Sequence, residues 1–136
     1  MSGVFARNRE ETKIAFYYNA MELQKELTLY CMKEKYIPKK WRYAVGYNLI
    51  SKIDELVDNI TYANSIYPTD DKELELRKHY QTLAICNCFQ IQNKIVRMER
   101  CIETVKIEHL EKIIDLLSHE VVLLKAWKKS NKIYNK

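Results

Sequence analysis

The chain has 136 residues, a formal net charge of +5 and a hydrophobic share of 47%, as expected of one folded domain and not of a disordered segment. Only two glycines and two prolines are present, which argues against β-rich folds and glycine-rich phosphate loops, because both depend on these residues. No stretch approaches the roughly 20 apolar residues of a membrane span and no signal-peptide core begins the chain, so we expect a cytoplasmic protein without a membrane partner.

Apolar residues recur every three or four positions along four successive segments, which is the spacing of amphipathic helices. The first predicted helix covers residues 10–35. The second covers residues 39–66 and follows Pro38, because proline ends a helix before it and fits the first turn of the next. Gly46 lies inside this second pattern, where we expect it to allow close approach of another backbone.

The third predicted helix covers residues 70–103 and begins after Pro68, with acidic residues that suit a helix N-terminus. The fourth covers residues 107–132. Together the four segments predict an all-α, up-down-up-down four-helix bundle in one domain of residues 1–136. The apolar stripe of the third helix consists of Leu76, Tyr80, Leu83, Ala84, Ile91, Ile95, Met98 and Ile102.

The third and fourth helices carry more apolar residues than one buried face requires. Two explanations fit this surplus: a second buried surface used for self-association, or a wide core face. The surplus residues lie off the main stripes and are Ile85, Cys88, Phe89, Val96, Val122, Leu123 and Ala126.

Residues that could carry catalysis or bind a metal are few. The four cysteines include no Cys-x-x-Cys pair, and the three histidines form no Glu-x-x-His or His-Glu-x-x-His motif. Glu75 with His79, and Asp115 with His119, stand four residues apart, a spacing that suits a shared metal ion but also arises from ordinary surface composition. We therefore expect reduced thiols, no metal or other cofactor and no catalytic residue; a small bundle enzyme or metal protein is the alternative.

Basic residues gather in three clusters with few acids among them. Such clusters suit the phosphate backbone of nucleic acids, and tyrosines interleaved with them, at Tyr36, Tyr43, Tyr47 and Tyr62, suit stacking on unpaired bases. The alternative is that the charges solvate exposed faces and the aromatic rings fill the core. The predicted nucleic-acid-binding residues are Lys39, Lys40 and Arg42 at the first link, Lys94, Arg97 and Arg100 on the third helix, and Lys125, Lys128, Lys129 and Lys132 near the C-terminus.

Two stretches of the second helix resemble a known family. Residues 37–46 join a proline, a basic and aromatic link and a glycine, and residues 56–64 follow near the end of the same helix. Both are similar to the accessory variability determinant (Avd) proteins of diversity-generating retroelements. That family is grouped with the four-helix proteins encoded in intervening sequences of bacterial large-subunit ribosomal RNA genes. The resemblance extends over residues 17–132 and is strongest in the second helix.

This resemblance implies a non-catalytic four-helix bundle that assembles as a homopentamer, binds nucleic acid through a basic surface and associates with a reverse transcriptase. With template RNA, such proteins support error-prone cDNA synthesis. Lys39, Lys40 and Arg42 lie in the matching link, whereas the C-terminal lysines match no family motif. The ribosomal-insert branch implies instead a scaffold that binds a protein partner and no specific RNA.

Overall fold

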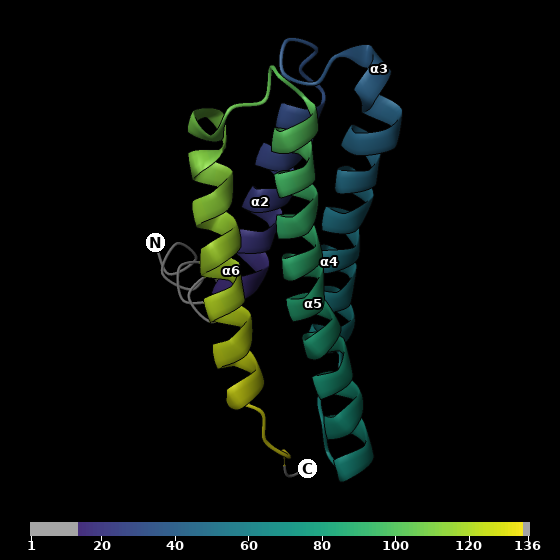
Figure 1. Ribbon diagram of the computed structural model, residues 1–136. Helices are drawn as coiled ribbons and strands as arrows, with labels where there is room; N and C mark the ends of the chain where they lie inside the picture. The colour runs from purple at the N-terminus through teal and green to yellow at the C-terminus, as the bar shows by residue number, and fades with distance from the viewer. Residues whose placement is uncertain (1–13, 135–136) are drawn as a thin grey trace, which may run out of the picture.

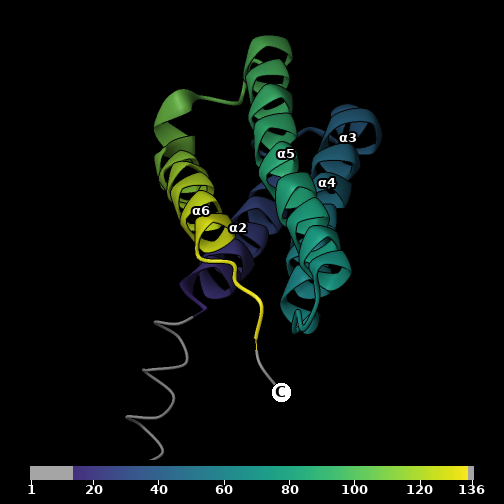
Figure 2. The same cartoon turned by 90° about the horizontal axis from the view of Figure 1, so that it is seen from below.

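The computed structural model describes residues 14–134, and within this range the chain forms four long helices joined by short links (Figure 1). They are α2 (Ala15–Cys31), α4 (Tyr47–Ser65), α5 (Asp71–Cys101) and α6 (Glu111–Lys129). Each helix packs on the next in the chain and α6 packs back on α2, so that directions alternate around the bundle (Figures 1 and 2). The predicted all-α, up-down-up-down four-helix bundle is confirmed.

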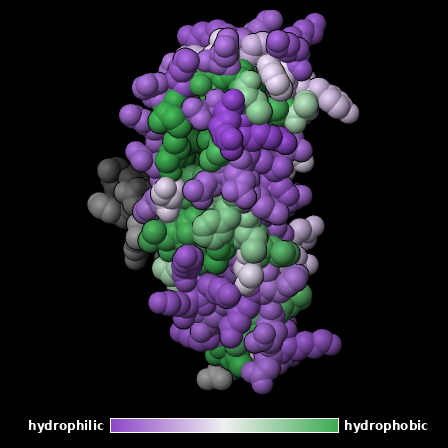
Figure 3. All heavy atoms as spheres, viewed as in Figure 1, coloured by the Kyte–Doolittle hydropathy of each residue, from purple (hydrophilic) through white to green (hydrophobic). Residues whose placement is uncertain are grey.

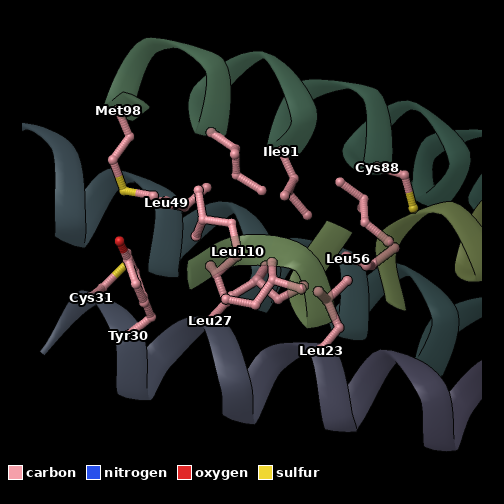
Figure 4. Close-up of a cluster of buried hydrophobic side chains, with 14 of the residues drawn as sticks. Leu23, Leu27, Tyr30, Cys31, Leu49, Leu56, Cys88, Ile91, Met98 and Leu110 are labelled. Atoms are coloured by element: carbon pink, nitrogen blue, oxygen red, sulfur yellow. The ribbon is translucent and has the colours of Figure 1, made fainter. Parts of the chain in front are cut away.

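The core runs along the axis of the bundle and receives side chains from all four helices. Figure 4 shows Leu23 and Leu27 of α2 facing Leu56 of α4 and Ile91 of α5, and all four are fully buried. Tyr30 and Cys31 lie opposite Met98 toward one end. None of the helices described is both long and apolar enough to span a membrane.

The first helix ends at Cys31, four residues earlier than predicted, and residues 10–13 of that prediction lie outside the described residues. A turn follows in which the Ile37 N–H donates to the Lys33 carbonyl at 2.9 Å. This turn brings the Ile37 side chain into the core, where it is fully buried. Burial of Ile37 therefore favours leaving the helix before Pro38 would end it.

The second predicted helix is confirmed as a nearly continuous helical run, although it is not a uniform α-helix. It begins with the short α3 (Lys39–Trp41), widens into a π-helical turn η1 (Arg42–Gly46) and continues as α4. Such turns hold one extra residue and occur frequently at functional sites. The periodicity of apolar residues did not reveal this turn.

Gly46 lies buried at the end of the π-helical turn. A Cβ atom on it would lie 3.7 Å from the Cys31 carbonyl oxygen and 3.7 Å from both Arg42 Cγ and Ile37 Cγ2. The C-terminal end of α2 thus lies beside this glycine, but the predicted need for a glycine there is not borne out, because a Cβ atom would fit. These distances are ordinary van der Waals contacts, so the site has space for a methyl group and for little more.

Helix α5 begins with a reciprocal capping arrangement and ends at Cys101. The Asp70 carboxylate accepts from the Glu73 N–H at 2.8 Å, and Glu73 accepts from the Thr69 N–H at 2.9 Å. The predicted stripe is wrong at Leu76 and Leu83, which are exposed.

Two polar residues, Gln81 and Asn87, lie in the buried face of α5. Asn87 is tolerated there because Asn59 of α4 donates to it at 2.7 Å and Asn87 donates to Glu55 at 3.2 Å. Gln81 and Asn131 likewise exchange hydrogen bonds between their side-chain amides.

The fourth predicted helix consists of a 3-10 turn η2 (Ile107–Leu110) followed by α6, which ends at Lys129 and not at residue 132. Beyond it the chain is extended and crosses the base of the bundle (Figure 2). The Tyr134 N–H donates to the Pro68 carbonyl at 2.9 Å, and the Tyr134 ring stacks on Tyr67 with centroids 4.2 Å apart. These contacts draw the last residues away from the axis of α6.

Candidate nucleic-acid interface

The ten predicted cations do not form one surface. Lys39, Lys40 and Arg42 lie at the end of the bundle where α5 terminates, whereas Lys128 and Lys129 end α6 at the opposite end (Figure 1). The 31 residues of α5 span about 45 Å at a rise of about 1.5 Å per residue, which is roughly the separation of the two ends.

The three predicted cations of α5 do not line up parallel to the helix axis. Successive steps of three residues rotate about 60° around an α-helix, so Lys94, Arg97 and Arg100 spread over roughly 120°. Lys94 is half-buried, whereas Arg97 and Arg100 are exposed. Of the three, only the two arginines at the end of the helix therefore present their charges fully to solvent.

The α6 lysines converge on a second helix. Lys125, Lys128 and Lys129 line a groove between α5 and α6, and Lys78 of α5 lines it as well. We call these four residues the lysine groove. Its other lining residues are uncharged, and they are Thr82, Ile85, Cys86, Val122 and Ala126.

Lys132 lies outside the lysine groove. It follows the end of α6, and its Nζ atom lies 5.2 Å from the centre of the Tyr134 ring. Lys132 is thus separated from the other predicted C-terminal lysines, because α6 ends at Lys129 and not at residue 132. Lys78, in contrast, is not among the ten predicted cations, because helical spacing could not reveal that it faces α6.

The line of contact between α5 and α6 also contains an apolar cleft of about 380 Å³, which lies nearer than the lysine groove to the end where α5 terminates. We define the apolar cleft by Phe89, Ile95, Val96, Ile107, Ile114 and Val121. Phe89, Val96 and Ile107 are exposed, and Figure 3 shows hydrophobic patches on this face over α5 and α6. Glu99 also lines the apolar cleft, so its charge differs from that of the lysine groove.

The surplus apolar residues divide between the two explanations offered for them. Phe89, Val96 and Val122 are exposed and form part of an uncovered surface. Cys88 is buried in the core, and Ile85 and Leu123 are half-buried against it. The surplus therefore includes both a widened core face and exposed apolar side chains.

Within residues 14–134, none of the ten predicted cations forms an ion pair with a described carboxylate. The described ion pairs use other lysines: Lys25 with Glu22, Lys52 with Glu55, Lys78 with Glu75, and Lys112 with Glu22 and Glu26. Lys125 instead lies 5.8 Å over the Phe89 ring. None of the ten charges is thus neutralised by direct contact with a described acid.

The predicted stacking tyrosines differ in exposure. Tyr43 is 84% exposed and Tyr47 48% exposed, with ring centroids 6.4 Å apart in an edge-to-face arrangement. Tyr36 is instead half-buried and stacks on Tyr30 at 4.7 Å. Tyr62 is exposed but stacks on Tyr80 at 5.0 Å. Of these four tyrosines, only Tyr43 and Tyr47 are exposed and have each other as their ring contact.

Glu120 of α6 is a buried acid that the sequence analysis did not single out. Its side chain is fully buried, and Oε1 accepts from the Asn19 amide at 3.0 Å, whereas Oε2 has no described partner. Burial raises the pKa of Glu120 to about 8, and the Asn19 hydrogen bond opposes this rise only in part. Glu120 therefore holds its proton at neutral pH.

The cysteines are free thiols, of which Cys31 and Cys88 are buried. Burial raises the pKa of each to about 12, so neither is a reactive thiolate at neutral pH. Among the described residues, no three His, Cys, Asp or Glu side chains are placed to hold a metal ion together.

Comparisons of the chain with protein-family models, with curated proteins and with solved structures give no match. The resemblance to Avd proteins therefore stays a prediction.

Proposed function

We propose that the protein is a non-catalytic accessory subunit that binds nucleic acid, as the resemblance to Avd proteins implies. In this role it would bind template RNA and the reverse transcriptase of a diversity-generating retroelement and support mutagenic cDNA synthesis. The lysine groove is the proposed contact with the phosphate backbone.

The observation that carries this proposal is the convergence of Lys125, Lys128 and Lys129 on one groove that no carboxylate lines. Lys78 lines the groove from α5 and also pairs with Glu75 outside the lining, at 3.6 Å. Lysines brought together from two helices repel one another, and an anion bound between them relieves that repulsion. Each phosphate that a lysine neutralises also releases condensed counterions, which favours binding at low salt.

A protein partner is supported by the apolar cleft, which continues along the same seam. Exposed Phe89, Val96 and Ile107 form an apolar surface of the kind that marks protein contacts. We propose that this surface contacts another copy of the chain or the reverse transcriptase. The homopentamer implied by the family resemblance is the proposed assembly.

The test is the salt dependence of RNA binding by fluorescence anisotropy. The variant Lys125→Ala/Lys128→Ala/Lys129→Ala should weaken binding to a single strand and lower the log–log slope of affinity against salt by about 0.7 for each phosphate that is no longer neutralised. Lys25→Ala/Lys52→Ala/Lys112→Ala is the matched control, because it removes the same charge from lysines already paired with glutamates. This control should leave the slope nearly unchanged.

Two other results are informative. If Arg97→Ala/Arg100→Ala lowers the slope and the lysine triple variant does not, the phosphate-binding site lies on α5 and not in the lysine groove. If the wild-type protein shows no salt-dependent affinity for RNA, the proposal is wrong. The second candidate, a scaffold of the ribosomal-insert type that binds only protein, would then be favoured by the apolar cleft.

A further inference from the structure

The end of the bundle formed by α3 and the π-helical turn belongs to a segment with cations and no acid. No aspartate or glutamate occurs between Glu34 and Asp54. Lys39 and Lys40 are exposed in this stretch, and neither they nor Arg42 pair with a described carboxylate. This segment therefore carries unpaired positive charge at the end of the bundle where α5 terminates (Figure 1). The lysine groove lies roughly 20–35 Å away along α5, because its residues Lys78 to Cys86 precede the end of that helix at Cys101.

Aromatic rings stand among these cations. Lys40 Nζ lies 5.9 Å from the centre of the half-buried Trp41 ring. Val45 and Gly46 occupy the buried side of the π-helical turn, and Tyr43 lies on its solvent side, 84% exposed. The neighbouring Tyr47, one turn later, meets it edge to face, an arrangement that leaves ring faces uncovered.

We propose that this end is a second nucleic-acid surface, selective for unpaired bases. Tyr43 and Tyr47 stack on the faces of bases, while Lys39, Lys40 and Arg42 hold the adjoining phosphates. Cations beside exposed aromatic rings are the combination that binds single strands without sequence preference. In a duplex the base faces are already stacked on one another, so these rings have little to contact there.

This inference rests on the proposed function in one respect, namely that the ligand is a nucleic acid. It adds a separate site and a class of ligand, the single strand. The two proposals are separable in experiment, because the lysine groove acts through phosphates alone and this end acts through bases as well.

The experiment compares an unstructured 20-nucleotide RNA with its blunt-ended duplex by fluorescence anisotropy. Tyr43→Ala/Tyr47→Ala should weaken single-strand binding by at least about fivefold for each base that no longer stacks on a ring. The slope against salt should not change, because the cations that hold the phosphates remain, and duplex affinity should stay within twofold. Tyr43→Phe/Tyr47→Phe keeps the rings and should bind like the wild type.

Two controls accompany this comparison. Tyr18→Ala removes a partly exposed tyrosine of α2 near the opposite end of the bundle and should change neither affinity. Lys39→Ala/Lys40→Ala should lower the single-strand slope by up to about 1.4, at about 0.7 for each phosphate that a lysine neutralises.

Three results would overturn the inference. If the tyrosine variant binds the single strand like the wild type while the lysine-groove variant binds it weakly, the inference is wrong and the proposed function stands. If the wild-type protein binds neither RNA, both are wrong, and a protein partner is the better candidate for this end. If the tyrosine variant changes the mass measured by light scattering, the rings form an interface between subunits.

Discussion

Glu120 makes the stability of the fold depend on pH in the direction opposite to that of most carboxylates. Its pKa rises from 4.5 to about 8 in the folded protein because the side chain is fully buried. The groups facing it are the Asn19 amide of α2 and the Cys88 thiol of α5, and neither carries a positive charge. The folded state therefore holds the proton of Glu120 at pH values where the unfolded state has released it.

The magnitude follows from this difference in pKa. The contribution of Glu120 to the free energy of unfolding is greatest below about pH 4.5. It falls by roughly 1.4 kcal/mol per pH unit as the pH rises to about 8. Across the whole window the loss is about 5 kcal/mol, which is a large part of the free energy of unfolding of a typical domain. Above pH 8 both states release the proton, so the loss does not grow further.

Urea denaturation followed by circular dichroism between pH 5 and pH 9 measures this loss. Glu120→Gln removes the titration and keeps an oxygen that accepts from Asn19. It should match the wild type near pH 5 and be more stable by about 4 kcal/mol at pH 8. Asp115→Asn, at an exposed acid of the same helix, should reproduce the wild-type profile within about 0.5 kcal/mol. Equal pH slopes for the wild type and Glu120→Gln would refute a protonated Glu120.

Two further predictions concern packing and assembly. Gly46→Ala should be neutral or stabilise the protein by up to about 1 kcal/mol, because a methyl group fits and alanine favours helix. Gly46→Leu should instead cost roughly 1–3 kcal/mol of stability by overpacking against Cys31 and Ile37. Equal melting temperatures for the two variants would contradict this prediction. Light scattering should give a mass near five times the 16.3 kDa of the chain, which Phe89→Glu/Val96→Glu should reduce, and a wild-type mass near 16 kDa at micromolar concentration would exclude the assembly.

The helices were predictable because each repeats an apolar pattern many times, and an error at one position does not change the pattern. Their ends depend on single contacts between distant residues. The early end of α2 reflects the burial of Ile37, and the early end of α6 accompanies the pairing of Tyr134 with Pro68. Periodicity within a segment contains no information about either contact.

The same distinction applies to the candidate interface. Charge runs along the sequence identified Lys125, Lys128 and Lys129, because these lysines share one helix. Lys78 joins them only through the packing of α5 on α6. Glu120 was missed because its burial beside the uncharged Asn19 amide follows only from the packing of α2 on α6. Asn87 was missed for a related reason, since its partners Asn59 and Glu55 belong to α4.

The two seams of α5 differ in how firmly they close. On one side α5 packs closely along α4, and the Asn59, Asn87 and Glu55 side chains fix the register of the two helices. On the other side the seam with α6 is open enough to form both the lysine groove and the apolar cleft. Helices α4 and α5 are also consecutive in the chain, so their pairing closes only a short loop and is expected to form early in folding. We expect α6 to dock last and to detach first, so that native-state hydrogen exchange is slowest in α4 and α5 and the opening of lowest free energy exposes Glu120 to water.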